Sequence, residues 1–534
     1  MRFPTSYDHV VVGAGAAGCA IAGRLTEDPD RRVLLLEAGG PDDAERVHAT
    51  DLGSMTSMWF DPAVTWQHAT VPQAGCGGRS IPIPQGRMLG GGSSVNAMMY
   101  VRGNRRDFDR WRDLGADGWA YADVLPYFRA AETYAGGDPA YRGTSGPLRV
   151  IDYPLPAVSS VAFVEGARRL GFDADPAAGP DYNGARQEDA PFYYQSTRSE
   201  PGRRCSAADA FLRPALGRPN LTVLTGATVE RVLLDGDTAV GVELTRAGAR
   251  HRIGADAEVV LSAGTLASPR LLMLSGIGPA DHLRASGVDP LVDLPGVGRD
   301  LQDHLLFGVG WESLVDLPFP QLLAEAGLFT RTVAAPSAGP DLQFFAGPVQ
   351  FMDDRYKTDG PGFTFAPILV APRSRGTVTL DPVDPTGPPV VDPHYLDAGE
   401  DVDALVEGIA LARDVAHTPP FDGLRGRELA PGEEVRDRAG LVDYVRRSAS
   451  TVWHPAGTCR MGRDPGAVVD PRLRVHGVAN LRVADASVMP TVVAGNTNAA
   501  AIMIGCRAAD LLLDAVPAGA ASPVHRPDPR MVPQ

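Results

Sequence analysis

The chain has 534 residues, which is too long for one compact core and suits two domains. Hydrophobic residues make up 44% and charged residues 22%, an ordinary globular balance that excludes a disordered chain. The formal net charge of −15 would repel phosphate backbones and anionic membrane surfaces, so nucleic acid is not expected as a partner.

The cysteines and the lengths of the apolar runs indicate the cellular compartment in which the protein is expected. The five cysteines are scattered without paired spacing, so they predict neither a metal site nor a disulfide framework. No apolar run reaches the roughly 18 residues that span a bilayer. The residues before Asp8 leave no room for a secretion signal. We therefore expect a cytoplasmic protein without stable membrane insertion and without a metal.

Residues 8–37 predict a strand, a glycine turn, a helix and a second strand, which together form a βαβ unit. In such a unit Gly13 permits the tight turn, Gly15 lets a pyrophosphate approach the backbone, and Gly18 lets helix and strand pack closely. Glu37 follows Gly18 by 19 residues, where a carboxylate can accept ribose hydroxyls. This context favours dinucleotide binding over a turn without ligand, and it leaves NAD and FAD open.

Apolar spacing predicts the later elements in chain order. The segment 305–450, rich in proline, is the candidate for a second, substrate-facing domain. We expect helices within 105–132, short strands at 221–224, 240–244 and 258–261, strands at 363–370 and 377–380, a helix over 401–415, a strand at 481–485 and a closing helix over 498–513.

Two long motifs resemble those of the glucose-methanol-choline (GMC) oxidoreductases. The first covers 86–96 and continues through Tyr100 and Gly103 to Asp109; the second comprises Gly264-Thr265, Ser268-Pro269 and 275–278. The resemblance extends from Tyr7 to about Asp514, and its motifs are nearest to choline dehydrogenase and hydroxymethylfurfural oxidase-like members.

The resemblance implies an α/β fold in which a Rossmann-like FAD-binding domain is interleaved with an α+β substrate domain built on an antiparallel sheet. It implies FAD as the cofactor and a small-molecule alcohol as the substrate. The expected FAD-binding domain comprises 1–155, 200–304 and 450–516; the substrate domain comprises 156–199 and 305–449, and 517–534 forms a flexible tail.

By the same resemblance, the first motif lies along the pyrophosphate and isoalloxazine, where small residues let backbone N–H groups reach oxygen atoms. Val229 is expected at the adenine, and Asp485-Ala486 over the phosphate and ribityl region. The expected cofactor-binding residues are Gly13, Gly15, Ala16, Ala17, Gly18, Glu37, Ala38, Arg87, Leu89, Gly90, Gly91, Ser93, Ser94, Asn96, Ala97, Met98, Val229, Ala263, Gly264, Trp453, Asp485, Ala486, Asn496 and Thr497.

The stretch 452–458 resembles the catalytic segment of the family, and 496–498 resembles the second one, in which members carry His or Asn at the last position. The expected catalytic pair is therefore His454 with Asn498. His454 would take the hydroxyl proton while a hydride moves to the flavin N5, since imidazole has a suitable pKa. Asn498 would hold the alkoxide by hydrogen bonding. We interpret His304 as a structural histidine.

At two places the sequence differs from some relatives, and these differences refine the predicted attachment of FAD and the predicted substrate. Some relatives attach FAD through a histidine where this chain has Val95, so we expect non-covalent FAD. Choline-oxidising relatives carry a glutamate shortly after an Asp-His pair, whereas 305–307 here are Leu-Leu-Phe, which favours an apolar or aromatic alcohol.

The sequence leaves several alternatives open. They are a non-redox lyase of the same fold similar to hydroxynitrile lyases, a flavin monooxygenase, and a binding or scaffold protein. Also open are the electron acceptor, which is O₂ or another molecule, and an oligomeric state.

Overall fold

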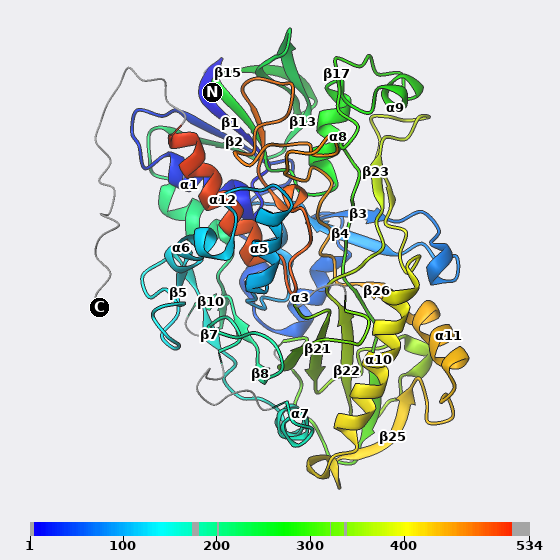
Figure 1. Cartoon of the computed structure of the whole chain (residues 1–534). Coiled ribbons are helices and arrows are strands. Elements are labelled where there is room, and N and C mark those ends of the chain that lie inside the picture. Colours follow the sequence, from blue (N-terminus) through cyan, green and yellow to red (C-terminus); the bar gives the residue numbers. More distant parts are fainter. Residues whose placement is uncertain (1–4, 173–180, 200–201, 321, 336–338, 515–534) are drawn as a thin grey trace.

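The computed structural model describes residues 5–172, 181–199, 202–320, 322–335 and 339–514. Two sheets lie at opposite ends of the molecule, with the helices and loops of the intervening segments between and around them (Figure 1). The expected tail 517–534 lies outside the described residues.

The first sheet is built on the predicted βαβ unit. Its parallel part has the order β12-β2-β1-β15-β27, and every residue of β2 is buried, as expected for a strand covered on both faces. The first half of the long strand β15 continues into an antiparallel meander with β14 and β13. The elements are β1 (Ser6–Val12), α1 (Ala16–Leu25), β2 (Val33–Leu36), β12 (Leu221–Leu224), β13 (Ala227–Asp235), β14 (Thr238–Arg246), β15 (Ala249–Leu261) and β27 (Leu481–Val483).

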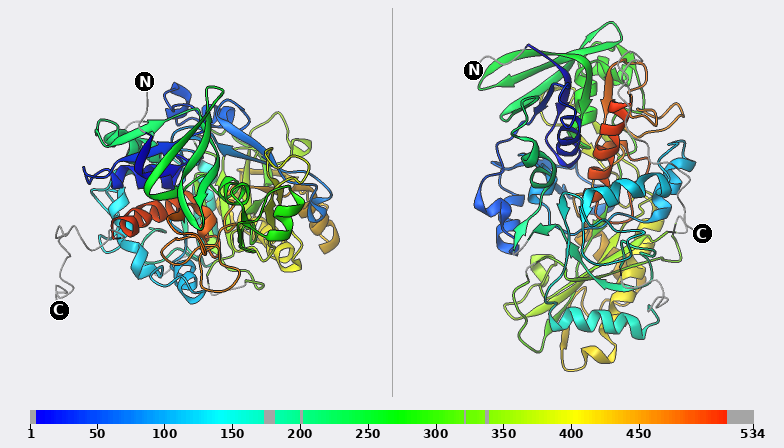
Figure 2. Two further views of the ribbon diagram at one scale, coloured as in Figure 1. Left: turned by 90° about the horizontal axis from the view of Figure 1, so that it is seen from above. Right: turned by 90° about the vertical axis from the view of Figure 1, so that its left-hand side faces the viewer.

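The closing helix α12 (Asn498–Leu513) packs against α1, and the two lie side by side in Figure 2. The contact is close because small residues meet there: a Cβ on Gly505 would lie 2.5 Å from the carbonyl oxygen of Ala17. This packing places the first residue of α12 near the carboxyl ends of β1 and β2, the edge at which open α/β sheets bind ligands.

The second sheet is antiparallel, with the order β25-β19-β22-β21-β20-β8 and with β18 joining β22 to β26. Helices α7 (Val158–Arg169) and α10 (Gly399–Ala416) pack on it, so β21 and β22 are buried throughout. Its strands are β8 (Pro191–Tyr193), β18 (Leu305–Leu306), β19 (Val309–Ser313), β20 (Ala326–Thr330), β21 (Leu342–Gly347), β22 (Gly362–Leu369), β25 (Arg425–Ala430) and β26 (Ser450–Thr451).

The remaining helices and strands connect or flank the two sheets. They are α2 (Glu45–His48), α3 (Leu52–Trp59), β3 (Thr65–Ala69), β4 (Pro82–Gly86), α4 (Gly92–Val95), α5 (Arg105–Asp113), α6 (Tyr121–Ala131), β5 (Glu132–Thr133), β6 (Leu148–Arg149), β7 (Ile151–Asp152), β9 (Gln195–Ser196), β10 (Arg198–Ser199), β11 (Arg203–Arg204), α8 (Ala267–Leu274), β16 (Ile277–Gly278), α9 (Ala280–Ala285), β17 (Val292–Asp293), β23 (Thr377–Thr379), β24 (Val390–Asp392) and α11 (Arg438–Ser448).

The predicted fold class is confirmed, and the predicted elements are present with shifted ends. The predicted strand at 481–485 stops at Val483 because Asp485 turns to accept a hydrogen bond from the backbone N–H of Ser487. The segment 105–132 forms two helices because Gly115 and Gly118 take positive φ values of 96° and 81° between them. The domain boundaries stay a prediction.

Candidate functional site

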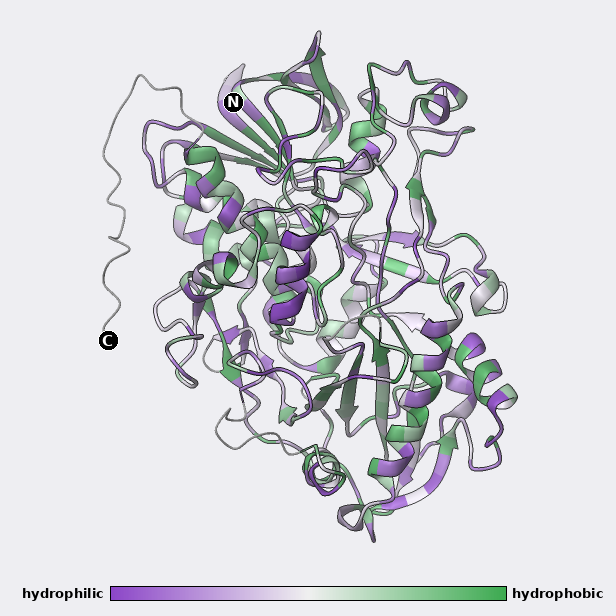
Figure 3. Ribbon diagram, in the orientation of Figure 1, coloured by the Kyte–Doolittle hydropathy of each residue, from purple (hydrophilic) through white to green (hydrophobic). Residues whose placement is uncertain are grey.

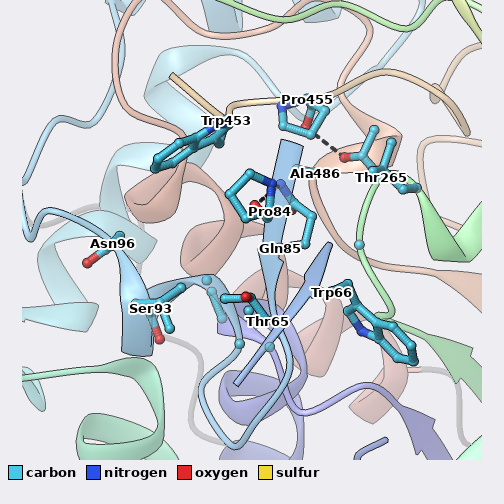
Figure 4. A pocket seen from close by; sticks show the side chains of 18 of the residues that line it. Thr65, Trp66, Pro84, Gln85, Ser93, Asn96, Thr265, Trp453, Pro455 and Ala486 are labelled. Atoms are coloured by element: carbon cyan, nitrogen blue, oxygen red, sulfur yellow. Dashed lines mark hydrogen bonds between the residues drawn. The ribbon is translucent and has the colours of Figure 1, made fainter. Parts of the chain in front are cut away.

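A cavity of about 570 Å³ lies between the two sheets, within the usual range for ligand pockets. One end is lined by the glycine turn before α1, and the other by residues of the antiparallel sheet, including Leu306 and Phe345. Figure 4 shows side chains from distant segments, among them Trp66, Asn96 and Trp453, arranged around this space.

The glycine turn has no room for side chains. Gly13 has φ of +99°, and a Cβ there would lie 2.4 Å from the carbonyl oxygen of Ser262. A Cβ on Gly18 would lie 1.9 Å from the carbonyl oxygen of Gly13, and one on Gly91 would lie 2.8 Å from Cα of Gly15. The two glycine turns therefore touch on the cavity wall, where backbone can approach a diphosphate closely. These residues fit the adenosine diphosphate part of FAD.

Glu37 lines the cavity at the end of β2. Its Oε2 accepts a hydrogen bond from the N–H of Ala14 (3.0 Å), and its Oε1 accepts one from Gly39 (2.8 Å). Burial raises the pKa of Glu37 to about 7, and the same N–H donors oppose that shift. Each carboxylate oxygen can accept a second hydrogen bond, so ribose hydroxyls can still be held here.

The first motif contributes only some of its expected residues to the cavity wall. Arg87, Leu89, Gly90 and Ser94 do not line it. Ser94 Oγ donates to the carbonyl of Leu89 (2.7 Å), the N–H of Gly90 donates to the carbonyl of Ala14 (2.8 Å), and the Arg87 guanidinium lies 4.4 Å from the Trp66 ring centroid. We therefore revise their expected role from cofactor contact to holding the loop.

Gly18 also lies away from the cavity wall and serves helix packing, as its place in the glycine pattern implies. The other expected residues line the cavity: Gly13, Gly15, Ala16, Ala17, Glu37, Ala38, Gly91, Ser93, Asn96, Ala97, Met98, Val229, Ala263, Gly264, Trp453, His454, Asp485, Ala486, Asn496, Thr497 and Asn498.

The second motif is tied to the segments that follow it in the site. Asp485 Oδ2 accepts hydrogen bonds from the N–H of Gly264 (2.9 Å) and from Ser268 Oγ (2.6 Å). Thr265 Oγ1 donates to the carbonyl of Pro455 (2.7 Å), as drawn in Figure 4. The residue next to His454 is therefore fixed to the loop that follows β15.

His454 is held at three atoms. Its backbone N–H donates to Asp303 Oδ1 (2.9 Å), its Nδ1 lies 3.1 Å from His304 Nδ1, and its Nε2 lies 3.4 Å from Asn496 Nδ2. Burial lowers the pKa of His454 to about 3 and that of His304 well below its ordinary value. Both imidazoles are thus neutral near pH 7, and one proton lies between the two Nδ1 atoms.

Asp303 organises the backbone at both histidines. Its Oδ1 accepts hydrogen bonds from the backbone N–H groups of His304 and His454. Its Oδ2 accepts hydrogen bonds from the hydroxyl groups of Tyr395 (2.6 Å) and Thr451 (2.5 Å). Burial raises the pKa of Asp303 to about 6. The interpretation of His304 as a purely structural histidine is incomplete, because its ring contacts that of His454.

Asn496, two residues before the expected partner, faces His454. Asn498 lines the cavity as the first residue of α12, but no hydrogen bond within the described residues joins its side chain to His454. Gln343 Nε2, from β21, lies 3.4 Å from Asn496 Oδ1 and donates to Tyr194 Oη (2.8 Å). With its oxygen facing Gln343, Asn496 presents its amide nitrogen to His454.

The wall beside His454 is aromatic. Trp453 donates from Nε1 to the carbonyl of Pro82 (3.1 Å), and its ring lies edge-on to Trp59 and Phe60 at centroid distances of 4.9 and 6.1 Å. Among the described lining residues the carboxylates are those of Glu37 and Asp485, both at the cofactor end. The apolar Leu306, expected near the substrate, lines the cavity. No signal in the sequence indicated these lining residues: Trp59, Phe60, Trp66, His68, Gln85, Arg270, Leu323, Phe345 and Phe351.

The family model for GMC oxidoreductases matches residues 7–306 and its C-terminal counterpart matches 372–505. The chain belongs to the GMC oxidoreductase family. Members of this family are FAD-dependent oxidoreductases that act on alcohols, so the predicted cofactor and reaction type are confirmed.

Relatives of this GMC oxidoreductase match over nearly their whole length. An oxygen-dependent choline dehydrogenase of Sinorhizobium fredii is 38% identical, over 96% of each chain. An uncharacterized GMC-type oxidoreductase of Mycobacterium tuberculosis is 41% identical, over 95% of this chain and 99% of its own. The crystal structure of pyridoxine 4-oxidase from Mesorbium loti has a TM-score of 0.87 at 34% identity, over 95% of this chain and 99% of its own.

Two further observations concern the described part of this GMC oxidoreductase. None of its helices is both long and apolar enough to cross a membrane, and no cluster of His, Cys, Asp and Glu has the arrangement of a metal site. All five cysteines are buried and unpaired.

Proposed function

We propose that this GMC oxidoreductase oxidises an uncharged aromatic or aliphatic primary or secondary alcohol to the carbonyl. The observation that carries the proposal is the wall beside His454, which is aromatic and apolar and has no carboxylate among the described residues. Aromatic rings alone can bind a quaternary ammonium group, so the support for an uncharged alcohol is the lack of a lining carboxylate at this end among the described residues. Under this proposal the chain differs in its substrate from the choline dehydrogenases that it resembles.

His454 is the proposed base. Its Nε2 is the ring nitrogen that faces Asn496 in the cavity, while Nδ1 is engaged with His304. A hydroxyl proton taken up at Nε2 makes the His454 ring cationic. The Nδ1 atom of the neutral His304 can then accept a hydrogen bond from the Nδ1–H of His454 and stabilise that charge. FAD, when bound, supplies the acceptor for the hydride.

Asn496 is the proposed partner that holds the substrate oxygen, in place of Asn498. Its amide nitrogen faces the same point as His454 Nε2, so it can donate a hydrogen bond to the oxygen whose proton His454 removes. The aromatic rings of Trp453 and Trp59 line the same cavity and pack against each other.

The test is to mix the FAD-loaded protein with an alcohol in the absence of oxygen. Reduction of the flavin is measured as the loss of its visible absorbance. Benzyl alcohol should bleach the flavin at least about 100-fold faster than choline at equal concentration, the range of discrimination that one apolar pocket provides. Faster bleaching by choline would reject the proposed substrate class. No bleaching by any alcohol would favour the lyase alternative, which the oxidases and dehydrogenases among the relatives do not support.

We further propose that the FAD is bound without a covalent link, that O₂ or another acceptor reoxidises it, and that the protein is cytoplasmic and can form an oligomer. The valine at position 95 of the cavity wall supports the first point, and the unpaired cysteines support the location. Mixing reduced enzyme with air-saturated buffer tests O₂ as the acceptor, since a true oxidase is reoxidised within its turnover time.

A further inference from the structure

A second cavity, of about 390 Å³, lies beside α5 and shares no lining residue with the larger one. Figure 3 shows α5 as one of the most hydrophilic helices on the face in view. The cavity reaches inward to the buried side chains of Gln302 and Val492. Its lining residues are Arg106, Asp107, Arg110, Gln302, Ala371, Pro372, Arg373, Arg375, Thr491 and Val492.

Four guanidinium groups and one carboxylate line this cavity. Such a concentration of positive charge contrasts with the net charge of −15 of the whole chain. Arg106 lies 3.6 Å from the half-buried Glu188, and Arg373 lies 3.5 Å from the exposed Glu400, so both are long ion pairs. These two charges are partly balanced by protein groups.

Arg110 and Arg375 are not balanced in this way, since neither forms an ion pair with a carboxylate of the described residues. Arg375 is held in place, because its Nη1 donates to the carbonyls of Pro372 (2.7 Å) and Ser374 (2.9 Å). Burial lowers the pKa of Arg375; the charges of Asp300 and Asp401 oppose this shift, and the positive charge of Arg110 adds to it. The two guanidinium groups repel each other across the cavity, and an anion between them would reduce that repulsion.

The carboxylate of Asp107, which also lines the cavity, does not serve as the anion between these two arginines. Asp107 Oδ2 accepts hydrogen bonds from the backbone N–H groups of Asn104 (2.8 Å) and Ala494 (2.7 Å). It therefore serves as a cap for α5 and as an anchor for the segment that leads to Asn496. The guanidinium N–H groups of Arg110 and the free edge of Arg375 remain available to a ligand.

We propose that this cavity binds a phosphate group, either free or as a phosphate ester. Guanidinium forks bind phosphate oxygens in pairs, and the cavity holds two of them that lack a protein anion. Its volume exceeds that of one phosphate several-fold, which leaves room for the organic part of an ester.

The site is linked to the segment that carries Asn496. Gln302 Oε1 accepts the N–H of Val492 (3.2 Å), and Asp107 accepts that of Ala494 two residues further along. Both anchoring side chains line the cavity. A bound phosphate would therefore restrain the segment 491–496 as well as neutralise the arginines.

Calorimetric titration of the full-length, FAD-loaded protein with inorganic phosphate tests the proposal, with chloride used to keep the ionic strength constant. We expect one saturable site per chain and a melting temperature that rises with phosphate. Arg110→Gln should weaken binding by about tenfold or more, the usual cost of one charged hydrogen-bond partner. Arg375→Lys, which keeps the charge and loses the fork, should also weaken it.

Arg112→Gln is the matched control, because Arg112 lies on the same helix, is exposed and pairs with Asp113. It should bind phosphate as the unmodified protein does. Tighter binding of glycerol phosphate than of inorganic phosphate would identify an ester as the ligand, and equal binding would identify free phosphate. Absence of saturable binding, or an equal loss in Arg112→Gln, would overturn the proposal.

Discussion

A histidine that takes a proton must be neutral beforehand and correctly oriented, and at His454 both conditions have visible causes. Burial keeps the ring neutral, and Asp303 holds its backbone. The Nδ1 contact with His304 then leaves Nε2 directed to the cavity. These two neighbours, rather than the histidine alone, leave one ring nitrogen of the proposed base free to accept a proton.

Replacing His454 by alanine should slow anaerobic flavin reduction by alcohol by roughly 10²–10⁴, the usual contribution of a positioned base. The protein should still contain FAD, because the cofactor is held mainly by other segments. Stopped-flow spectroscopy measures the rate. The exposed His417, at the end of α10, provides the control variant His417→Ala, and an unchanged rate in His454→Ala would remove His454 from the mechanism.

The two asparagines can be separated by substitution. Asn496→Ala should lower the rate of flavin reduction by roughly 10²–10³, as loss of an oxyanion donor does elsewhere, because its amide faces His454 Nε2. Asn498→Ala should lower it less. The same stopped-flow measurement on both variants decides between them, and a larger loss in Asn498→Ala would restore the assignment made from sequence.

The pH dependence follows from the lowered pKa of His454. A base is active in its neutral form, which exists above its pKa and disappears as the pH falls through it. Because burial lowers this pKa to about 3, titration of His454 should not lower the limiting rate of flavin reduction between about pH 8 and about pH 5. A limb near pH 6 that disappears in Asp303→Asn would belong to Asp303, whose pKa burial raises to about 6. A limb near about 6.5, the pKa of free imidazole, that persists in that variant would show that His454 is not buried in the complex.

At the level of elements, two glycine turns from distant parts of the chain build the cofactor end of the cavity. Gly15 begins α1 and Gly91 begins α4, and their backbones touch. Neither turn can form this surface alone, because each supplies only part of the backbone that a diphosphate would meet. We therefore expect FAD binding to require their mutual contact.

Gly91→Ala should reduce the FAD content of the purified protein. The new Cβ would lie 2.8 Å from Cα of Gly15, and the backbone of Gly91, with φ of 51° and ψ of −129°, lies outside the regions open to side chains, which adds roughly 1–3 kcal/mol of strain. The ratio of flavin to protein absorbance measures occupancy. Gly40→Ala, where a Cβ meets nothing within 4 Å, should keep full occupancy; if both variants retain FAD equally, the contact between the turns is dispensable.

For the whole molecule, the site exists because the two sheets contribute opposite walls of one cavity. The parallel sheet supplies the glycine turn and Glu37, and the antiparallel sheet supplies Leu306, Phe345 and the Gln343 that orients Asn496. The chain passes between the sheets several times, so residues near both ends of the sequence meet there.

The intact protein should release its FAD on acid precipitation. Val95 lines the cavity and offers no nucleophile for a covalent bond to the flavin. Unfolding should therefore place all the flavin in the supernatant, where its absorbance is measured. Flavin that remains with the pellet would contradict non-covalent binding, and a mixture of free FAD with unrelated carrier protein controls for trapping.

The sequence by itself determined the features that depend on local spacing. The βαβ unit, the glycine turn with Glu37, the two family motifs and His454 are each contained in one short segment, where residue type and separation decide the local conformation. Local spacing could not predict the role of a residue that depends on a partner from a distant part of the chain. The motif residues Arg87, Leu89, Gly90 and Ser94 lie in the expected loop, but only the packed loop shows that they do not line the cavity.

Tertiary structure alone decided the partners of His454. His304 lies 150 residues before it, and Gln343 acts on Asn496 from 153 residues away, so no local spacing reports either contact. The choice between Asn496 and Asn498 depends on where α12 begins, which is set by its packing on α1. The sequence thus specified the chemistry of the site, and the packing of the two sheets selected the atoms that carry it.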